Sequence, residues 1–333
     1  MRKVLLISNY KKNVGGISGQ VDLLYDRLKQ EGYQVGALGT RLNPLKRLLL
    51  PIVLIQKGIK FDIFHIHGCS YLGFFPIVLG VTIGKILKKK IIVTYHGGDA
   101  DLFFQTYSNF VRFFLLKTNH NIVLSDFLGN IFKKHSIPFT IISNCIEFKE
   151  NQYHERTIIR PRFISIRSLT PLYNVECIIK AFEIVQKKYK DSILYILGDG
   201  QDRTKLENLV KELNLENVFF IGRVKNEDIY NYLINSDILL SSPIIDNQPI
   251  SILEAFNAGL LVISSRVGGV PFMVNENISG LLFESNNFIE MSKKMMYALE
   301  NQNETMFMIK NAKEECLNYT WDIIRTKLLP LYE

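Results

Sequence analysis

Short apolar runs alternate with longer segments of helical periodicity along the whole chain. The runs are almost continuously apolar, which is typical of strands that a parallel sheet buries on both faces. Alternation of such strands with helices predicts an α/β fold in which helices cover both faces of parallel sheets. The predicted strands are residues 3–8, 34–39, 61–67, 90–96, 121–125 and 139–144, followed by 163–168, 193–198, 218–222, 238–242, 261–265 and 280–284.

These strands form two groups of six, so the pattern predicts two doubly wound, Rossmann-like domains. A polar stretch at about 147–161 is the expected linker. We therefore expect domains at 1–150 and 151–317, with a C-terminal helix of about 318–333 packing back on the first domain. Ligands of such sheets bind beyond the carboxyl ends of the strands, and we expect those edges of the two domains to face each other across a cleft.

Length and composition fit this picture. A chain of 333 residues is long enough for two domains, and 47% hydrophobic with 22% charged residues excludes a disordered or collagen-like protein. The four cysteines form no CxxC pair, which argues against a disulfide framework or a zinc ribbon and favours a reducing, cytoplasmic setting.

Neither of two candidate apolar stretches predicts a targeting or membrane-spanning segment. The run from Val4 to Ile7 is shorter than the apolar part of a signal peptide. The uncharged stretch from Cys69 to Gly84 is shorter than the roughly 20 residues that a spanning helix needs. We interpret these stretches as a buried strand and a buried helix.

Charge is divided unevenly between the halves of the chain. Residues 1–150 carry 20 Lys and Arg against 9 Asp and Glu, while residues 151–333 carry 20 against 23. A basic half indicates an anionic partner. We expect that partner to be an anionic membrane surface at the inner face of the membrane, and no nucleic acid. The alternative is that these lysines only solvate the surface.

Glycines and histidines follow the strands of the first half. Gly15 and Gly16 form a loop that opens a helix, where bare backbone can approach an anion or a sugar. The spacing is not GxGxxG, which argues against nicotinamide or flavin binding, and a purely geometric turn stays open. His65 and His67 end the third strand and share one side of it, and His96 ends the fourth.

We favour a functional role for His96, whereas for His67 a core role is at least as well supported by the pattern. Asp99-Ala100-Asp101 resembles a DxD metal motif, but it stands where a helix begins. Carboxylates are favoured at helix N-termini, so we prefer capping and expect no metal.

The second half holds two acidic residues, Asp246 and Glu254, eight positions apart across a loop and the start of a helix. The first backbone N–H groups of such a helix are free to bind a diphosphate. A structural alternative is equally open: Ser251 and Glu254 also fit a capping box, S-x-x-E.

Together these features resemble the retaining glycosyltransferases of family 4, also called glycosyl transferases group 1, which have the GT-B fold. The resemblance covers essentially the whole chain and is strongest from residue 162 to 300. It rests on HIHG (65–68), TYHGG (94–98), LGDGQDRTKLENL (197–209), VFFIGRV (218–224), SSRVGGVPFMV (264–274), and an acidic pair that reads Asp-x7-Glu instead of Glu-x7-Glu.

The resemblance implies a nucleotide diphosphate sugar donor, no metal and no cofactor. It implies that Glu254 holds the ribose hydroxyls and that His96 meets the donor sugar near the reaction centre. The weaker acceptor assignments are His67 and Asp99. The remaining implied donor contacts are Asp246, Asn247, Gln248 and Ile250 with the sugar, Gly15, Gly16, Ile252 and Leu253 with the diphosphate, and Arg223 at the base.

Two departures from the family pattern concern positive charge. The usual Gly-Arg-Leu reads Arg167-Ser168-Leu169, and the usual Lys-Gly reads Tyr173-Asn174. We expect Arg167 to supply a cation for the diphosphate. A third departure places Phe272 where the family commonly has Glu.

The function implied is a retaining hexosyl- or N-acetylhexosaminyltransferase that acts on a glycan or lipid-linked acceptor in cell-surface polysaccharide biosynthesis, such as lipopolysaccharide or capsule. The alternative is a non-catalytic GT-B partner or glycan-binding subunit of a glycosyltransferase complex. A sugar-nucleotide epimerase of related fold is a third hypothesis.

Overall fold

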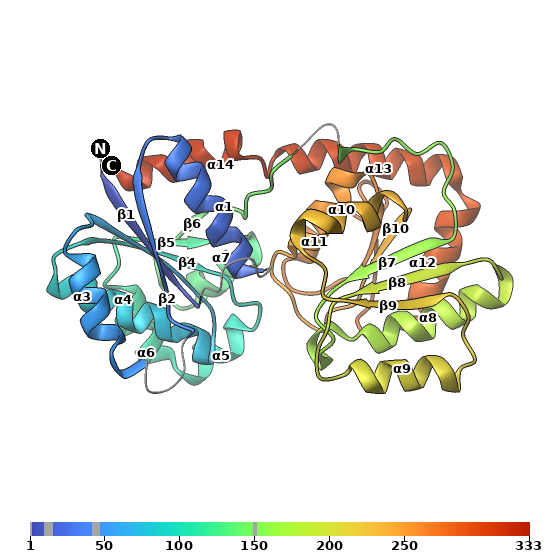
Figure 1. Ribbon diagram of the computed structural model, residues 1–333, viewed down its shortest axis with the longest axis horizontal. Coiled ribbons are helices and arrows are strands. Elements are labelled where there is room, and N and C mark those ends of the chain that lie inside the picture. Colours follow the sequence, from blue (N-terminus) through green and yellow to red (C-terminus); the bar gives the residue numbers. More distant parts are fainter. Residues whose placement is uncertain (1, 10–15, 42–46, 149–151) are drawn as a thin grey trace. The chain divides into compact units, whose positions relative to one another are not determined.

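The computed structural model describes residues 2–9, 16–41, 47–148 and 152–333 (Figure 1). The chain divides into two compact units, Met1–Cys145 with Trp321–Glu333, and Ile146–Thr320. The chain therefore passes between the units at Cys145 and Ile146 and again at Thr320 and Trp321. Its last residues pack with the first unit.

The first unit is built on one parallel sheet of six strands in the order β2-β1-β3-β4-β5-β6. The order reverses between β1 and β3, and such a switch point opens a crevice beyond the carboxyl ends of the strands. Central strands are buried along almost their whole length, as their apolar runs predict. The strands are β1 (Lys3–Ser8), β2 (Gln34–Gly39), β3 (Ile63–Gly68), β4 (Lys90–Tyr95), β5 (His120–Val123) and β6 (Thr140–Ile141).

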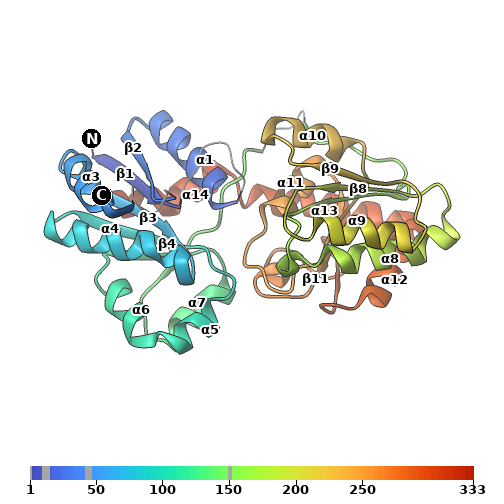
Figure 2. The ribbon, with the colours of Figure 1, turned by 60° about the horizontal axis from the view of Figure 1, so that its bottom comes forward.

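Helices cover both faces of this sheet. Helices α1 (Ile17–Gln30) and α14 (Trp321–Leu328) share one apolar core with it. A second core joins the opposite face to α3, α4, α5, α6 and α7, of which α3, α4 and α6 follow one another in Figure 2. Their bounds are α3 (Leu50–Gly58), α4 (Phe75–Ile86), α5 (Ala100–Thr106), α6 (Ser108–Leu115) and α7 (Asp126–Lys134).

Two helical segments of the first unit are divided in the structure. The segment at 70–88 begins as a 3-10 turn, Tyr71–Phe74, ahead of α4, whose early Pro76 suits a first helical turn. The segment at 100–118 breaks at Tyr107 into α5 and α6. This break lets Phe104 of α5 and Phe114 of α6 both enter the core.

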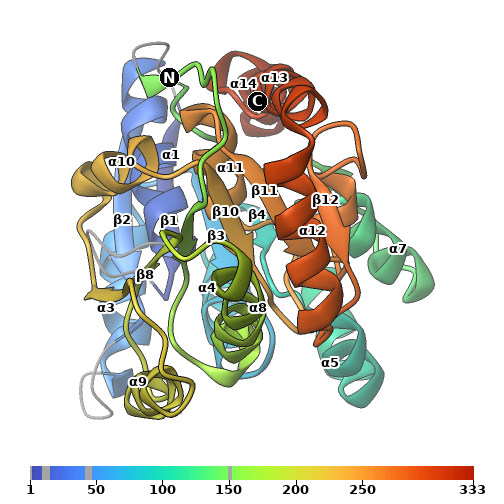
Figure 3. The same cartoon turned by 90° about the vertical axis from the view of Figure 1, so that its right-hand side faces the viewer.

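The second unit repeats the plan with the strand order β12-β11-β10-β7-β8-β9, which reverses between β7 and β10. Helices α8, α9 and α12 cover one face, and α10 and α11 cover the other; α8 and α12 pack side by side (Figure 3). Helix α13 contributes to both cores. The strands are β7 (Arg162–Ile166), β8 (Ile193–Leu197), β9 (Val218–Gly222), β10 (Ile238–Ser241), β11 (Leu261–Ser265) and β12 (Leu281–Phe283). The helices are α8 (Val175–Lys188), α9 (Arg203–Glu212), α10 (Asn226–Ile234), α11 (Ile250–Ala258), α12 (Phe288–Glu300) and α13 (Gln302–Leu317).

The predicted linker at 147–161 is not a free connection over its described part. Arg156 is buried and its Nε lies 2.9 Å from Oδ1 of the fully buried Asp237. The same guanidinium donates to the carbonyls of Ala258 and Ser236, and Arg160 also pairs with Asp237 at 2.8 Å. A buried charge needs such partners, so this segment is anchored to the second unit.

Among the residues that the structure describes, no helix is both long and apolar enough to cross a bilayer.

Candidate functional site

The loop after β10 carries Asp246 and is held from behind by a second loop. Gly268 lies at φ +52°, and a Cβ there would collide with the carbonyl oxygen of Asp246. A Cβ at Gly269 would collide in the same way with Asn247. The amide of Gly269 donates to the Asp246 carbonyl at 3.0 Å. Glycine is therefore required for the close approach that fixes the Asp246 backbone.

Arg167 is the first residue after β7, and its side chain reaches Asp246. Its Nη2 lies 3.1 Å from Oδ2 of Asp246 and 3.3 Å from Oγ of Ser241. Its guanidinium carbon lies 5.1 Å from the centre of the Tyr173 ring, within the range of a cation–π contact. Arg167 thus brings a fixed positive charge to the carboxyl end of this sheet.

The contacts of Arg167 leave part of its guanidinium without a partner. Its Nε is buried and makes no hydrogen bond among the described residues. The Oδ1 of Asp246 accepts from the amide of Asn247 at 2.8 Å, while its Oδ2 has only the ion pair with Arg167. A buried donor without a partner is costly, and a guanidinium with unused N–H donors is suited to bind an anion.

Glu254 lies in α11, and the capping-box interpretation is wrong. The helix begins at Ile250 with Pro249 as its N-cap, so Ser251 stands inside the helix and cannot cap it. Burial raises the pKa of Glu254 to about 7, and the nearby charge of Arg167 opposes that shift. A part-buried carboxyl group without a structural bond to Ser251 is free to accept hydrogen bonds from a ligand.

The first turn of α11 offers anion donors, but not all those expected. The amide of Ile252 already donates to the carbonyl of Pro249 at 3.1 Å, which removes it from the predicted diphosphate contacts. The amides of Ile250 and Ser251 make no hydrogen bond within the described part of the chain. The Oγ of Ser251 is also buried without a partner there.

The other predicted donor contacts lie at the same edge of the second sheet. Asn247 and Gln248 are buried in the loop between β10 and α11, and Leu253 is fully buried in α11. Arg223 follows β9 with a side chain that is 82% exposed, 3.9 Å from Asp199. This exposure leaves Arg223 free to move toward a ligand.

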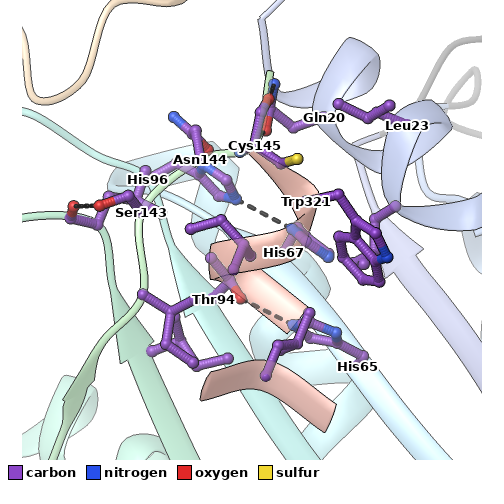
Figure 4. Close-up of a pocket in the computed structure, with 16 residues that line it drawn as sticks. Gln20, Leu23, His65, His67, Thr94, His96, Ser143, Asn144, Cys145 and Trp321 are labelled. Atoms are coloured by element: carbon purple, nitrogen blue, oxygen red, sulfur yellow. Dashed lines mark hydrogen bonds between the residues drawn. The ribbon is translucent and has the colours of Figure 1, made fainter. Parts of the chain in front are cut away.

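In the first unit, three histidines lie together in one pocket (Figure 4). The rings of His65 and His67 stack at 4.5 Å, which confirms that both point to one side of β3. Nδ1 of His67 lies 3.0 Å from Nε2 of His96, which follows β4. His65 is bound to Tyr332 at 2.6 Å and to Thr94 at 2.8 Å.

Burial keeps this cluster neutral. It lowers the pKa of His65 to about 3 and that of His96 to about 4, and it lowers the pKa of His67 well below its ordinary value. The pocket has a volume of about 50 Å³ and is closed on one side by α14. Its walls beyond the histidines include Gln20, Leu24, Ile122, Ile142, Trp321 and Ile324.

The structure describes most, but not all, of the remaining residues predicted to function in the first unit. Gly15 lies outside the described residues, whereas Gly16 precedes α1 at φ +68°, a conformation that favours glycine. Asp99 stands at the N-cap position of α5, but its side chain makes no capping hydrogen bond. Asp101 instead pairs with Lys134 at 3.0 Å.

Two residues beside the predicted donor contacts were missed by sequence reasoning. Tyr173 was noted only for the lysine it replaces, yet its ring supports Arg167. Ser251 was considered only as a cap, yet its hydroxyl stands unpartnered among the described residues at the start of α11. The sequence signal for Tyr173 was an arginine and an aromatic residue on either side of the turn that follows β7.

Comparison with known proteins agrees with this geometry. The family profile of glycosyl transferases group 1 matches residues 149–315, and that of glycosyltransferase family 4 matches residues 38–150. An uncharacterized glycosyltransferase of Methanocaldococcus jannaschii is 23% identical over 99% of this chain and 98% of its own. The N-acetyl-alpha-D-glucosaminyl L-malate synthase of Bacillus anthracis is 24% identical over 77% of this chain and 70% of its own.

Solved structures show the same fold. Anabaena HepE in complex with UDP-glucose has a TM-score of 0.78 at 16% identity, covering 100% of this chain and 99% of its own. Sucrose-phosphate synthase from Thermosynechococcus elongatus has a TM-score of 0.82 at 16% identity, covering 100% and 98%. The two units thus form the GT-B class of α/β fold. The chain belongs to the glycosyl transferases group 1 family.

Proposed function

We propose that this protein is a retaining glycosyltransferase that takes its sugar from a nucleotide diphosphate sugar. The observation that carries the proposal is the placement of Arg167, 3.1 Å from Asp246 and near Glu254, at the sheet edge where α11 begins with amides that are unpartnered among the described residues. A fixed cation and oriented N–H groups are what a diphosphate leaving group requires.

The proposed chemistry places most of the demand on the leaving group. The acceptor oxygen bonds to the anomeric carbon on the face from which the diphosphate departs, so the configuration is kept. The acceptor proton passes to a diphosphate oxygen, and Arg167 stabilises the remaining negative charge. Because Tyr173 and Asp246 already hold the guanidinium in place, little reorganisation is needed during the reaction.

The remaining roles follow the resemblance. Glu254 accepts hydrogen bonds from the ribose hydroxyls, and Asn247, Gln248 and the Ile250 amide face the donor sugar. Arg223 borders the base. His96 contacts the donor sugar. No metal is invoked, because backbone dipoles and Arg167 supply the positive charge.

We infer that the donor carries a hexose or an N-acetylhexosamine. Anabaena HepE is described as a complex with UDP-glucose. A Campylobacter jejuni relative, 27% identical over 46% of this chain and 41% of its own, is named as an N-acetylgalactosaminyltransferase acting on a diphospho-undecaprenol sugar. UDP-linked sugars of both kinds are therefore the first to test, with a lipid-linked glycan of the cell surface as acceptor.

The surface of the first unit fits an acceptor held in an anionic membrane. Helices α3 and α6 expose large apolar side chains, among them Ile52 at 53% and Phe113 at 55%. We call this the α3–α6 surface; its exposed apolar residues are Leu48, Leu49, Ile52, Val53, Phe110, Phe113 and Leu116, and its exposed basic residues are Arg47, Lys60, Lys85, Lys88 and Lys117.

Not every basic residue in the first half is free to face a lipid surface. Lys57 donates to the carbonyl of Ala37 at 2.7 Å, Lys89 donates to that of Ile59 at 3.2 Å, and Arg112 donates to that of His135. The bulky Phe103 and Phe104 are buried in the core. The exposed cations that remain still favour attraction to anionic lipid.

The test is a panel of sugar nucleotides with the full-length protein. Slow hydrolysis of one of them, releasing the sugar first as the same anomer, supports the proposal; anomers are distinguished by proton NMR. Release of the opposite anomer would exclude retention. Failure of every nucleotide sugar to bind or react would instead favour a non-catalytic GT-B partner.

A further inference from the structure

In the pocket of the first unit two imidazoles share a hydrogen bond, and the direction of that bond determines which nitrogen of His96 carries a proton. Nδ1 of His67 and Nε2 of His96 lie 3.0 Å apart, with the rings inclined by only 26°. One nitrogen must donate and the other must accept, because two bare nitrogens repel and two N–H groups clash. The direction decides where the proton of His96 lies.

The other nitrogen of His67 identifies the donor. Nε2 of His67 is buried and has no hydrogen-bond partner among the described residues. Figure 4 shows His67 between His96 and Trp321, and the indole N–H of Trp321 is already used by Glu31 at 2.9 Å. A buried N–H group without an acceptor is costlier than a bare ring nitrogen. His67 therefore carries its proton on Nδ1 and donates it to His96.

The environment of His67 holds its ring in this orientation. His65 stacks against it at 4.5 Å and is itself held at both nitrogens, by Tyr332 and by Thr94. The side chain of His67 is only 4% exposed, which argues against direct contact with an acceptor. Burial also lowers the pKa of His67 and His96, so each ring carries one proton at neutral pH.

We propose that His67 is a positioning residue that keeps His96 in the tautomer protonated on Nδ1. Since Nε2 of His96 accepts from His67, the Nδ1–H of His96 is the group left to meet a ligand. This nitrogen has no hydrogen-bond partner in the described part of the chain. His96 then acts as a hydrogen-bond donor to an oxygen of the donor sugar, a role that rests on the function proposed above.

A tautomer can be measured without any substrate. Histidine labelled with ¹⁵N distinguishes a protonated from a bare ring nitrogen in long-range proton–nitrogen spectra, and His96→Gln assigns the signals. We expect His96 to be protonated on Nδ1 in the full-length protein. Finding its proton on Nε2 would overturn the proposal, whatever the protein's activity proves to be.

Two substitutions separate positioning from packing. Asparagine places an N–H donor near the position of Nδ1, so His67→Asn should preserve the His96 tautomer. Leucine fills the space without a donor, so His67→Leu should let His96 exchange between both tautomers. A His96 signal that is unchanged in a folded His67→Leu protein would contradict the proposal.

The same variants connect the tautomer to turnover of UDP-glucose or UDP-N-acetylglucosamine, whichever the wild type hydrolyses. We expect His67→Leu to lower kcat about tenfold with little change in KM, the scale of one lost hydrogen bond, and His67→Asn to restore it. Wild-type turnover in His67→Leu would overturn the positioning role. Absence of turnover in the wild type, with the expected tautomer, would refute the proposed function while leaving the His67–His96 bond established.

Discussion

Nη2 of Arg167 lies 3.1 Å from Oδ2 of Asp246, and this pair joins the end of β7 to the loop that follows the neighbouring strand β10. The pair is mostly buried, with side chains 10% and 18% exposed. The aspartate therefore holds the guanidinium in place while leaving its Nε unpartnered among the described residues. In this chain Asp246, the first residue of the acidic pair, orients a cation.

Arg167→Ala should lower turnover of a nucleotide sugar by roughly 10²–10³-fold, the scale seen when a fixed transition-state donor is removed. Arg167→Lys should recover only part of that loss, because lysine lacks the planar group that stacks on Tyr173. Steady-state kinetics with the reactive sugar nucleotide provide the measurement. If Arg167→Ala turned over at the wild-type rate, another residue, for example Arg223, would supply the essential positive charge.

Glu254→Gln should weaken binding of the nucleotide sugar by about 10- to 100-fold, because a charge-assisted hydrogen bond to ribose contributes roughly 1.5–3 kcal/mol. The pKa of about 7 adds a pH signature. Binding to the wild type should strengthen as pH rises through 7 and Glu254 ionises, whereas binding to Glu254→Gln should stay flat. Calorimetric titration measures both, and a parallel pH dependence in the variant would refute the role of Glu254.

Acid should destabilise the first unit through its histidines. His65 and His96 have pKa values of about 3 and 4 when folded, below the ordinary value of 6.5. Between about pH 4 and 6.5 the unfolded chain therefore binds more protons than the folded chain. The free energy of unfolding then falls as the pH falls through this range. In His96→Gln, the free energy of unfolding measured with urea should decline less steeply over that pH range. An equally steep decline would show that protonation of His96 is not its cause.

The sequence predicts the strands well because parallel strands buried on both faces leave unbroken apolar runs, as in β10 and β11. It fails at Ser251 because S-x-x-E also occurs inside helices, and the start of α11 is determined by Pro249 and the preceding loop. The support of Arg167 by Tyr173 was hidden because it depends on the 3-10 turn Pro171–Tyr173 that folds the chain back.

Arg156→Ala should lower the free energy of unfolding of the second unit by about 3 kcal/mol or more, because it leaves Asp237 buried with less compensation. It also removes donors to the carbonyls of Ala258 and Ser236. Arg160→Ala is the matched control: its side chain is 38% exposed, so its loss should cost less. If both variants lost the same free energy of unfolding in urea titrations, burial of Arg156 would not explain its contribution.

The α3–α6 surface should bind anionic vesicles at low salt and release them at high salt. Anionic lipid attracts each nearby Lys or Arg by about 1 kcal/mol, and salt screens exposed charges. Sedimentation with phosphatidylserine-containing vesicles measures binding. Replacing Lys60, Lys85 and Lys88 with Gln should weaken it most at low salt, whereas Ile52→Ser should weaken it at every salt concentration by removing an inserted apolar group. Lys187→Gln, at an exposed position in the second unit, is the matched control and should bind as the wild type does. Equal binding to neutral and anionic vesicles would refute the electrostatic account, and binding to neither would indicate an acceptor that is not held in a membrane.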